Sequence, residues 1–183
     1  MKVIFLDIDG VMNSTEEMIA LYNQHGSSID NTLPSPTKCK LLKQLVDETG
    51  AKVVLSSSWR LSLNAIQKLI DLFEPYNLIL SGFTCHEVES KKFKNSPYED
   101  IKPRYQHTIG DFGTYIEDRG AEIANWLLDH PTVENFVILD DEDSDIKAWF
   151  PNNLVKTDPQ VGFTLNDCLK AAEILKGGKQ SGA

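Results

Sequence analysis

The feature that most constrains this chain is its opening apolar run, which stops abruptly at two carboxylates. Residues Val3–Leu6 predict a buried strand, and Asp7, Ile8, Asp9 and Gly10 follow it directly. Two carboxylates two residues apart would share one face of a continuing strand, where they repel each other and lose hydration. A divalent metal and a phosphate group are the partners that would relieve this cost. Gly10 allows the backbone to leave the strand in conformations closed to other residues.

Apolar runs and amphipathic segments alternate along the rest of the chain. Further strands are predicted at Lys52–Leu55, Asn77–Leu80, Asn135–Leu139 and Asn153–Lys156. Helices are predicted at Thr15–Tyr22, Pro36–Thr49, Leu63–Phe73, Ala121–Asp129 and Thr164–Leu175. This alternation is typical of a parallel sheet with crossover helices. The predicted fold is therefore α/β, a three-layer Rossmann-like arrangement of a five-stranded parallel sheet with helices on both faces.

The length of 183 residues predicts one domain spanning 1–183, with two insertions. Residues 14–36 are expected to form a short flap at the edge of the site. Residues 81–118 form a polar stretch, which we expect to be an ordered excursion on the substrate side, with a short hairpin. Residues 177–183 are expected to be a flexible tail.

Charge and cysteine content restrict the classes of partner. The net charge of -9 disfavours non-specific binding to nucleic acid or to an anionic membrane, although a phosphate could still be held locally. The three cysteines have no metal-ligand spacing, and the opening run is too short for a signal peptide. We therefore expect free thiols and a cytoplasmic location, with no membrane contact and no evident protein partner.

Polar clusters follow three of the apolar runs, each where the run ends. They are Asp7 with Asp9, Ser56 with Ser57 and Ser58, and Asp140 with Asp141. Because ligands of parallel sheets bind beyond the carboxyl ends of the strands, we expect these clusters to converge on one site. Any single cluster could instead cap the helix that follows it, but capping alone does not account for all three. Carboxylates gathered at one edge need a cation, and oxygen ligands favour Mg2+.

The stretch Asp7–Val11 resembles the first motif of the haloacid dehalogenase-like (HAD) superfamily, and further motifs follow in the family's order. The resemblance implies that Asp7 is the nucleophile and that Asp9 is the general acid and base. Ser56 matches the residue that hydrogen-bonds the transferring phosphoryl group. Ser57 or Ser58 would take this role if the second strand ends later.

Trp59 and Arg60 extend the second motif beyond its general form. Ser-Ser-Trp-Arg at this place is similar to a branch of HAD domains that includes those of RNA-repair proteins. Arg60 is expected to steer a phosphate, and a structural ion pair is the open alternative. Arg119 stands where most of the superfamily has Lys, and it would offset charge on Asp7; a solvated surface Arg is the alternative. The residues expected to bind the substrate are Gly10, Ser57 and Arg60.

The pair Asp140 and Asp141 resembles the acidic fourth motif. The resemblance implies that Asp141 is a direct metal ligand, and that Asp140 binds the metal or orients its water. Asp7 and the backbone carbonyl of Asp9 would complete the ligand set, and Asp145 is expected to lie farther from the metal. The implied cofactor is Mg2+.

Together the motifs imply a Mg2+-dependent phosphatase that hydrolyses a phosphomonoester through an aspartyl-phosphate. Small caps leave an open site, so the expected substrate is a phosphorylated small molecule, such as a nucleotide, or a nucleic-acid end. Two non-catalytic functions remain open: a phospho-acceptor switch and a degenerate HAD fold used as a binding module. The third predicted strand ends without an Asp, which disfavours the switch, and the complete acid sets disfavour the binding module.

Overall fold

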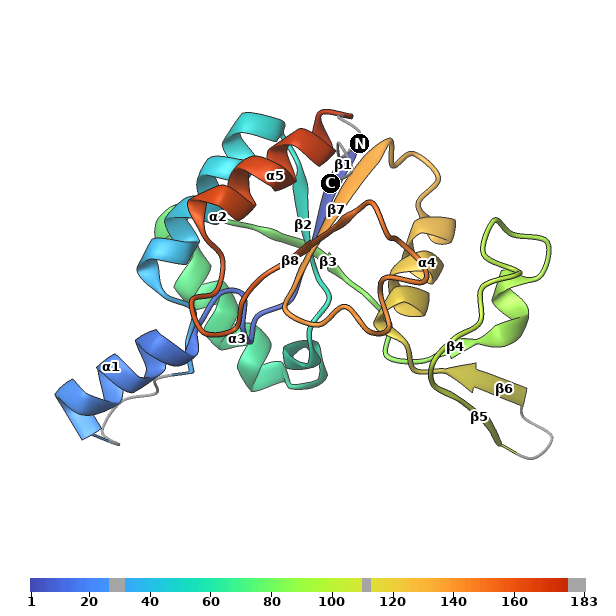
Figure 1. Ribbon diagram of the computed structural model, residues 1–183, viewed down its shortest axis with the longest axis horizontal. Helices are drawn as coiled ribbons and strands as arrows, with labels where there is room; N and C mark the ends of the chain where they lie inside the picture. Colours follow the sequence, from blue (N-terminus) through green and yellow to red (C-terminus); the bar gives the residue numbers. More distant parts are fainter. Residues whose placement is uncertain (27–31, 110–112, 178–183) are drawn as a thin grey trace.

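A five-stranded sheet forms the centre of the computed structural model, which describes residues 1–26, 32–109 and 113–177 (Figure 1). Its strands are β1 (Lys2–Leu6), β2 (Lys52–Leu55), β3 (Leu80–Phe83), β7 (Asn135–Asp140) and β8 (Leu154–Lys156). Their spatial order is β3-β2-β1-β7-β8, and every neighbouring pair is parallel. The predicted five-stranded parallel sheet is confirmed.

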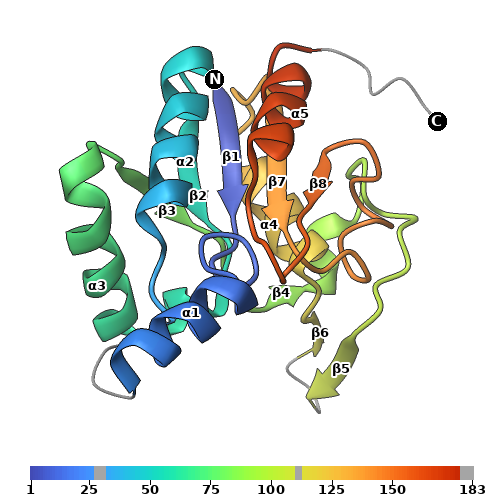
Figure 2. The same cartoon turned by 60° about the vertical axis from the view of Figure 1, so that its left-hand side comes forward.

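Helices cover both faces of this sheet, as the turned view shows (Figure 2). The helices are α1 (Thr15–His25), α2 (Pro36–Thr49), α3 (Leu63–Phe73), α4 (Arg119–Asp129) and α5 (Leu165–Leu175). Helices α2, α3 and α5 contribute to one buried apolar cluster, and α4 contributes to a second cluster on the opposite face. The three-layer arrangement is therefore also confirmed.

The central strand β1 supplies apolar side chains to both clusters. Ile4 and Leu6 belong to one cluster and Val3 and Phe5 to the other, and all four are fully buried. Successive side chains of a strand point to opposite faces, so a continuous apolar run is required where both faces are covered. Each such side chain stabilises the fold by about 1.5–3 kcal/mol relative to an exposed one. This burial fixes the strand that carries Asp7 at its end.

Local signals set the bounds of the best-predicted helix, α2. The side chain of Ser35 accepts a hydrogen bond from the backbone N–H of Lys38, and Pro36 occupies the first helical turn. The helix ends where Gly50 adopts φ +67° and donates its N–H to the carbonyl of Val46. Both signals are readable in the sequence, and the bounds of α2 match the prediction.

The third strand was predicted at 77–80, and this placement is wrong. Asn77 has a φ of 52° and donates to the carbonyl of Glu74, closing a one-turn 3-10 helix after α3. Ile79 is 75% exposed, and the strand runs from Leu80 to Phe83 instead. The apolar run 78–80 thus straddles the exit of a helix and the start of a strand, and periodicity does not separate the two.

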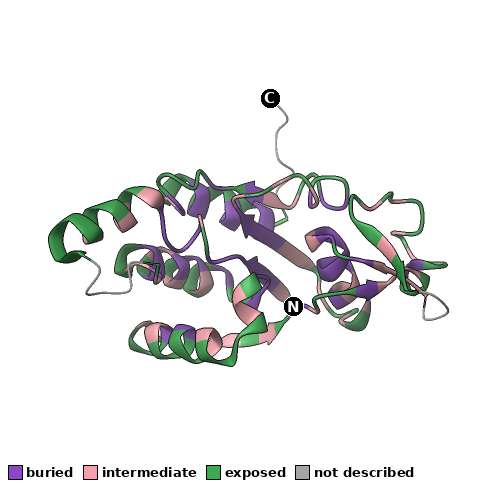
Figure 3. Cartoon of the chain, turned by 90° about the horizontal axis from the view of Figure 1, so that it is seen from below, coloured by how far each residue is buried: buried purple, intermediate pink, exposed green. Residues whose placement is uncertain are grey.

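Helix α1, in the predicted flap, is longer than predicted and reaches His25. None of its residues is buried (Figure 3). Ile19 and Tyr22 are both more than half exposed. In α3, Leu69 is fully buried, whereas Ile70 is 44% exposed. The loop residues 27–31 of the flap and tail residues 178–183 lie outside the described residues.

The excursion forms a second, smaller sheet beside α4 (Figure 1). Its strands are β4 (Val88–Glu89), β5 (Gln106–Ile109) and β6 (Gly113–Ile116), ordered β4-β6-β5 and antiparallel. Strands β5 and β6 form the expected hairpin, whose connection at 110–112 lies outside the described residues. Val88, Phe93 and Ile116 are buried in the same cluster as α4, so this sheet is anchored on the core. Within the described residues, no helix has the length and hydropathy needed to cross a bilayer.

Candidate active site

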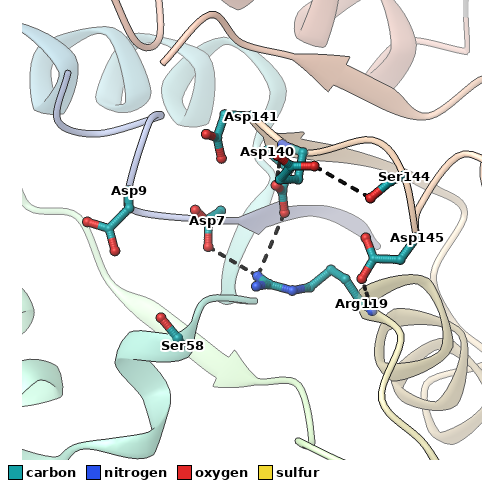
Figure 4. Close-up of a pocket in the computed structure, with 9 residues that line it drawn as sticks. Asp7, Asp9, Ser58, Arg119, Asp140, Asp141, Ser144 and Asp145 are labelled. Atoms are coloured by element: carbon teal, nitrogen blue, oxygen red, sulfur yellow. Dashed lines mark hydrogen bonds and ion pairs between the residues drawn. The ribbon is translucent and has the colours of Figure 1, made fainter. Parts of the chain in front are cut away.

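The site lies at the carboxyl ends of three adjacent strands (Figure 4). Leu6 of β1 pairs with Leu139 of β7, so the residues that follow these two strands emerge side by side. The backbone N–H of Asp7 donates to the carbonyl of Leu139 at 2.9 Å. The pocket here has a volume of about 250 Å³. It is lined by Asp7, Asp9, Ser58, Arg119, Asp140, Asp141, Glu142, Ser144 and Asp145.

Three carboxylates converge at the base of this pocket. One oxygen from each of Asp7, Asp140 and Asp141 lies within 4.8 Å of the other two. Burial raises the pKa of Asp7 to about 6, against the opposing effects of Arg119 and a hydrogen bond from Ser57. Burial, followed by repulsion from Asp7, raises the pKa of Asp140, and burial also raises that of Asp141.

These carboxylates fit the donor set of a hard divalent cation. All the ligand atoms are oxygens, and burial, the main cause of the raised pKa values of Asp7 and Asp140, disfavours their charged forms unless a cation is bound beside them. Mg2+ prefers oxygen ligands and binds through a few carboxylates while retaining water. The residues present therefore fit the expected ion.

The positively charged side chain of Arg119 contacts two of these acids. Its Nη1 atom donates to Oδ1 of Asp7 at 3.1 Å and lies 3.7 Å from Oδ2 of Asp140. Burial would lower the pKa of Arg119, but Asp140, Asp7 and Glu122 together raise it above its ordinary value. Arg119 begins α4, and its backbone N–H donates to Oδ2 of Asp145 at 3.0 Å. Asp145 thus positions the helix end that presents Arg119 to the pocket.

Gly10 closes the turn after the first motif. Its φ is +71°, and a Cβ placed there would lie 2.5 Å from Cγ of Asp141. Its N–H donates to the side chain of Asn13, and its carbonyl accepts from the hydroxyl of Thr157. Gly10 therefore adopts a backbone conformation that other residues disfavour, as predicted, and the lack of a side chain leaves room for Asp141.

Asp9 lies at the exposed rim of the pocket, apart from the buried acids (Figure 4). Its two oxygens accept hydrogen bonds from different donors. Nδ2 of Asn13 donates to Oδ1 at 2.9 Å, and the indole Nε1 of Trp59 donates to Oδ2 at 3.0 Å. An exposed carboxylate is thus held in one orientation.

The three serines after β2 have three different surroundings. Ser56 is buried, and its hydroxyl lies 3.4 Å from that of Thr84, away from the pocket lining. Ser57 is also buried and hydrogen-bonds Asp7. Ser58 is exposed and lines the pocket. The geometry therefore places Ser57 and Ser58, rather than the first choice Ser56, beside the carboxylates.

Arg60 does not line the pocket, because its guanidinium is held in a buried ion pair. Its Nη2 atom lies 2.6 Å from Oε2 of Glu122 and 3.0 Å from the carbonyl of Cys85, and Nη1 donates to the carbonyl of Ser57 at 2.6 Å. The Arg60 and Glu122 side chains are 6% and 4% exposed. This arrangement corresponds to the structural alternative for Arg60.

Sequence reasoning did not identify Glu122, Asn13 or Thr157 as neighbours of the site. Glu122 lies in the first turn of α4, where an acid is expected simply to complement the helix dipole. Its position three residues after Arg119 is the signal that could have linked the two, because Oε2 lies 3.9 Å from Nε of Arg119. Asn13 and Thr157 carry no comparable signal in the sequence.

Comparison with known proteins gives a family for this chain. The family model described as the HAD domain in Swiss Army Knife RNA repair proteins matches residues 3–168. No curated protein and no solved structure matches the chain. The matched span contains both ends of the site, from Asp7 to Asp145. Membership of this family supports a phosphatase-like function of the hydrolase type. The chain belongs to the HAD domains of Swiss Army Knife RNA repair proteins.

Proposed function

We propose that this chain is a Mg2+-dependent phosphatase that hydrolyses a phosphomonoester through an aspartyl-phosphate on Asp7. The observation that carries the proposal is the placement of Asp7, which lies 3.1 Å from Arg119 and within 4.8 Å of the Asp140 and Asp141 carboxylates. A nucleophilic carboxylate needs this combination, because the attacking oxygen must be oriented and the charge of the phosphoryl group must be offset.

Asp7, Asp140 and Asp141 would hold Mg2+, with the backbone carbonyl of Asp9 as the further ligand implied by the family pattern. When bound, the ion supplies positive charge that screens the carboxylates from the phosphate and polarises the phosphoryl oxygens.

The reaction proceeds in two displacements on phosphorus. A carboxylate oxygen of Asp7 attacks in line, the bond from phosphorus to the leaving oxygen breaks, and Asp9 gives that oxygen a proton. Water then attacks phosphorus, Asp9 takes a proton from it, and Asp7 and inorganic phosphate are released. Arg119 offsets negative charge on the Asp7 adduct in both steps.

The serines are assigned from their surroundings. Ser57 orients Asp7 through their hydrogen bond, and Ser58, which lines the pocket, contacts the phosphoryl group. Gly10 permits the approach of Asp141. Arg60 contributes by holding the Ser57 carbonyl rather than by touching the phosphate.

We propose a phosphorylated nucleotide or polynucleotide end as the substrate. Two observations support this class: the family name refers to RNA repair, and Asp9 and Ser58 are exposed at the rim of the pocket, where a bulky ester can enter. The net charge of -9 implies that binding of a long nucleic acid would be local to its phosphorylated end.

The first experiment measures hydrolysis of p-nitrophenyl phosphate with Mg2+, and again after adding EDTA. Turnover that EDTA abolishes and excess Mg2+ restores is expected. No turnover would favour the two non-catalytic alternatives, a phospho-acceptor or a binding module. A panel of mononucleotides, sugar phosphates, and oligonucleotides phosphorylated at the 3′ or 5′ end then tests the substrate class. We expect the highest kcat/KM on a nucleotide or oligonucleotide.

A further inference from the structure

The sequence Ser57-Ser58-Trp59-Arg60 contains one side chain that the proposed reaction does not use. Trp59 is partly buried against the apolar cluster that contains Leu55 and Leu69, and its indole N–H leaves this cluster to donate to Oδ2 of Asp9 at 3.0 Å. An indole N–H donates and does not accept, so this contact requires an acceptor at that point. Asp9 is the carboxyl group that must transfer protons in the proposed reaction.

The carboxyl group of Asp9 is fixed from two sides. Asn13 Nδ2 donates to the other oxygen, Oδ1, and Asn13 is itself held by the N–H of Gly10 and the carbonyl of Thr32. Without these two donors an exposed Asp would rotate among its side-chain rotamers. With them, each carboxyl oxygen keeps a lone pair through which it can give or take a proton.

Trp59 is itself held in place by the end of β2. It belongs to a one-turn 3-10 helix, Ser58–Leu61, and its backbone N–H donates to the hydroxyl of Ser57 at 3.4 Å. The carbonyl of Ser57 accepts from Arg60, whose guanidinium is paired with Glu122. The buried ion pair therefore braces the turn from which the indole reaches Asp9.

The position of Asp9 suits the leaving group. In an in-line displacement the leaving oxygen departs on the side of phosphorus opposite the attacking Asp7. Asp7 lies at the buried base of the pocket, so the leaving oxygen faces the exposed rim, where Asp9 lies (Figure 4). A proton from the Asp9 carboxyl group then bonds to the leaving oxygen, which keeps the electron pair of the broken bond to phosphorus.

We propose that Trp59 is a positioning residue that holds Asp9 at the rim for proton transfer to the leaving group. The inference rests on the proposed phosphatase function. It accounts for the tryptophan of this motif by the hydrogen bond that it makes. Its consequence is that the loss of the indole N–H should matter most for esters whose leaving group needs a proton.

The test compares Trp59→Phe with the wild-type chain on phosphate monoesters of graded leaving-group pKa. Phenylalanine keeps an aromatic ring against the cluster but removes the indole N–H together with part of the ring, and Trp126→Phe below controls for the lost volume. We compare kcat/KM, which reports the first displacement and not the later hydrolysis of the aspartyl-phosphate that is common to all the esters. On an alkyl phosphate kcat/KM should fall roughly tenfold, a part of the roughly 10²–10⁴-fold that a general acid contributes. On 2,4-dinitrophenyl phosphate, whose leaving group departs without a proton, we expect a change in kcat/KM under about twofold. Thermal unfolding of both proteins checks that the variant is folded.

A second variant tests whether Trp59 acts through Asp9. In the Asp9→Asn background there is no proton to deliver, so adding Trp59→Phe should cause no further loss on the alkyl phosphate. Trp126→Phe serves as a matched control in the core, and its effect should not depend on the leaving group.

Each possible result either supports or overturns the proposed role of Trp59. An equal loss by Trp59→Phe on both esters, or the same loss with and without Asp9, would mean that Trp59 acts only as packing and would overturn the inference while leaving the phosphatase proposal in place. A wild-type chain that hydrolyses none of the esters would overturn the proposed function, and the inference with it.

Discussion

Two buried ionic clusters meet at Arg119, and they differ in charge balance. On one side Arg119 faces the carboxylates of Asp7 and Asp140. On the other it approaches Glu122, which is paired with Arg60 at 2.6 Å. Both clusters are largely buried, and burial raises the pKa of Asp7 to about 6 and that of Glu122 to about 7. Among the described residues, only the first cluster gathers three acids around one arginine. An excess of acids is the property expected of a cation-binding cluster, whereas a paired arginine and glutamate are expected to support the fold.

Asp7→Asn is the sharpest test of this difference. The change removes the nucleophile, so we expect kcat to fall on the order of a thousandfold or more. It also removes one of the mutually repelling acids, so the free energy of unfolding in EDTA should be unchanged or slightly higher. Steady-state kinetics and urea unfolding measure the two quantities. Near-normal turnover would refute the assignment of Asp7.

Glu122→Gln should have the opposite effect on the free energy of unfolding, which we expect to fall. It leaves the guanidinium of Arg60 buried without its partner, and breaking a buried pair in this way costs about 3–5 kcal/mol. Urea unfolding followed by circular dichroism measures the loss. The control is Glu173→Gln, an exposed change on α5 that should stay within about 0.5 kcal/mol of the wild type. If both variants unfold alike, the pair is not part of the scaffold.

Binding of Mg2+ tests whether the first cluster is a cation site. Saturating Mg2+ should stabilise the wild-type chain, by about 2.7 kcal/mol at a hundred times the dissociation constant. Asp141→Asn should reduce this gain, because it removes a ligand oxygen. Asp143→Asn is the matched control, since Asp143 pairs with Lys147 and Lys156 outside the cluster. Thermal unfolding with and without Mg2+ gives the shifts. Equal shifts in the two variants would place the ion elsewhere.

Asp143 also gives the smallest expected effect, because it is a partly exposed surface residue. Hydrogen bonds from Lys156 and Lys147 lower its pKa from 3.8 to about 2. A carboxyl group whose pKa is lower in the folded state stabilises the fold above its unfolded pKa, and this contribution is lost as the pH falls from about 4 through about 2. Asp143→Asn should therefore cost a little stability at neutral pH, less at pH 2, and nothing once the pH is well below 2. A difference that does not shrink as the pH falls from about 4 to about 2 would contradict the ion-pair origin of the effect.

The sheet and most helices were predictable because their signals are local. Helix α2 has its cap, its first-turn proline and its closing Gly50 in the sequence, and its bounds matched. The shift of β3 was not predictable, since the apolar residues 78–80 suit a strand as well as a helix exit. The exposure of α1 could not be read from the sequence for a related reason: apolar side chains at helical spacing do not say whether another element will cover them.

The candidate site also has contacts that the sequence predicted and contacts that it did not. The approach of Asp7 to Asp140 followed from the parallel sheet, since β1 and β7 are neighbours and each ends at its acid. The serine that turns toward Asp7 depends on the course of the chain beyond β2. The partner of Arg60 depends on which side chain of α4 faces the second strand. The partner of a long polar side chain depends on which elements pack beside it, and spacing along the sequence does not give this.

By itself the sequence determined the alternation of strands and helices, the two-sided burial of the central strand, and the acids at the strand ends. Apolar periodicity and turn residues act over a few positions, so they can be read along the chain. Only the tertiary structure decided that Trp59 reaches Asp9, that Glu122 takes Arg60, and that Ser58 rather than Ser56 lines the pocket. Those contacts arise where β1, β2 and α4 pack together, and burial there leaves each polar group with few partners to choose from.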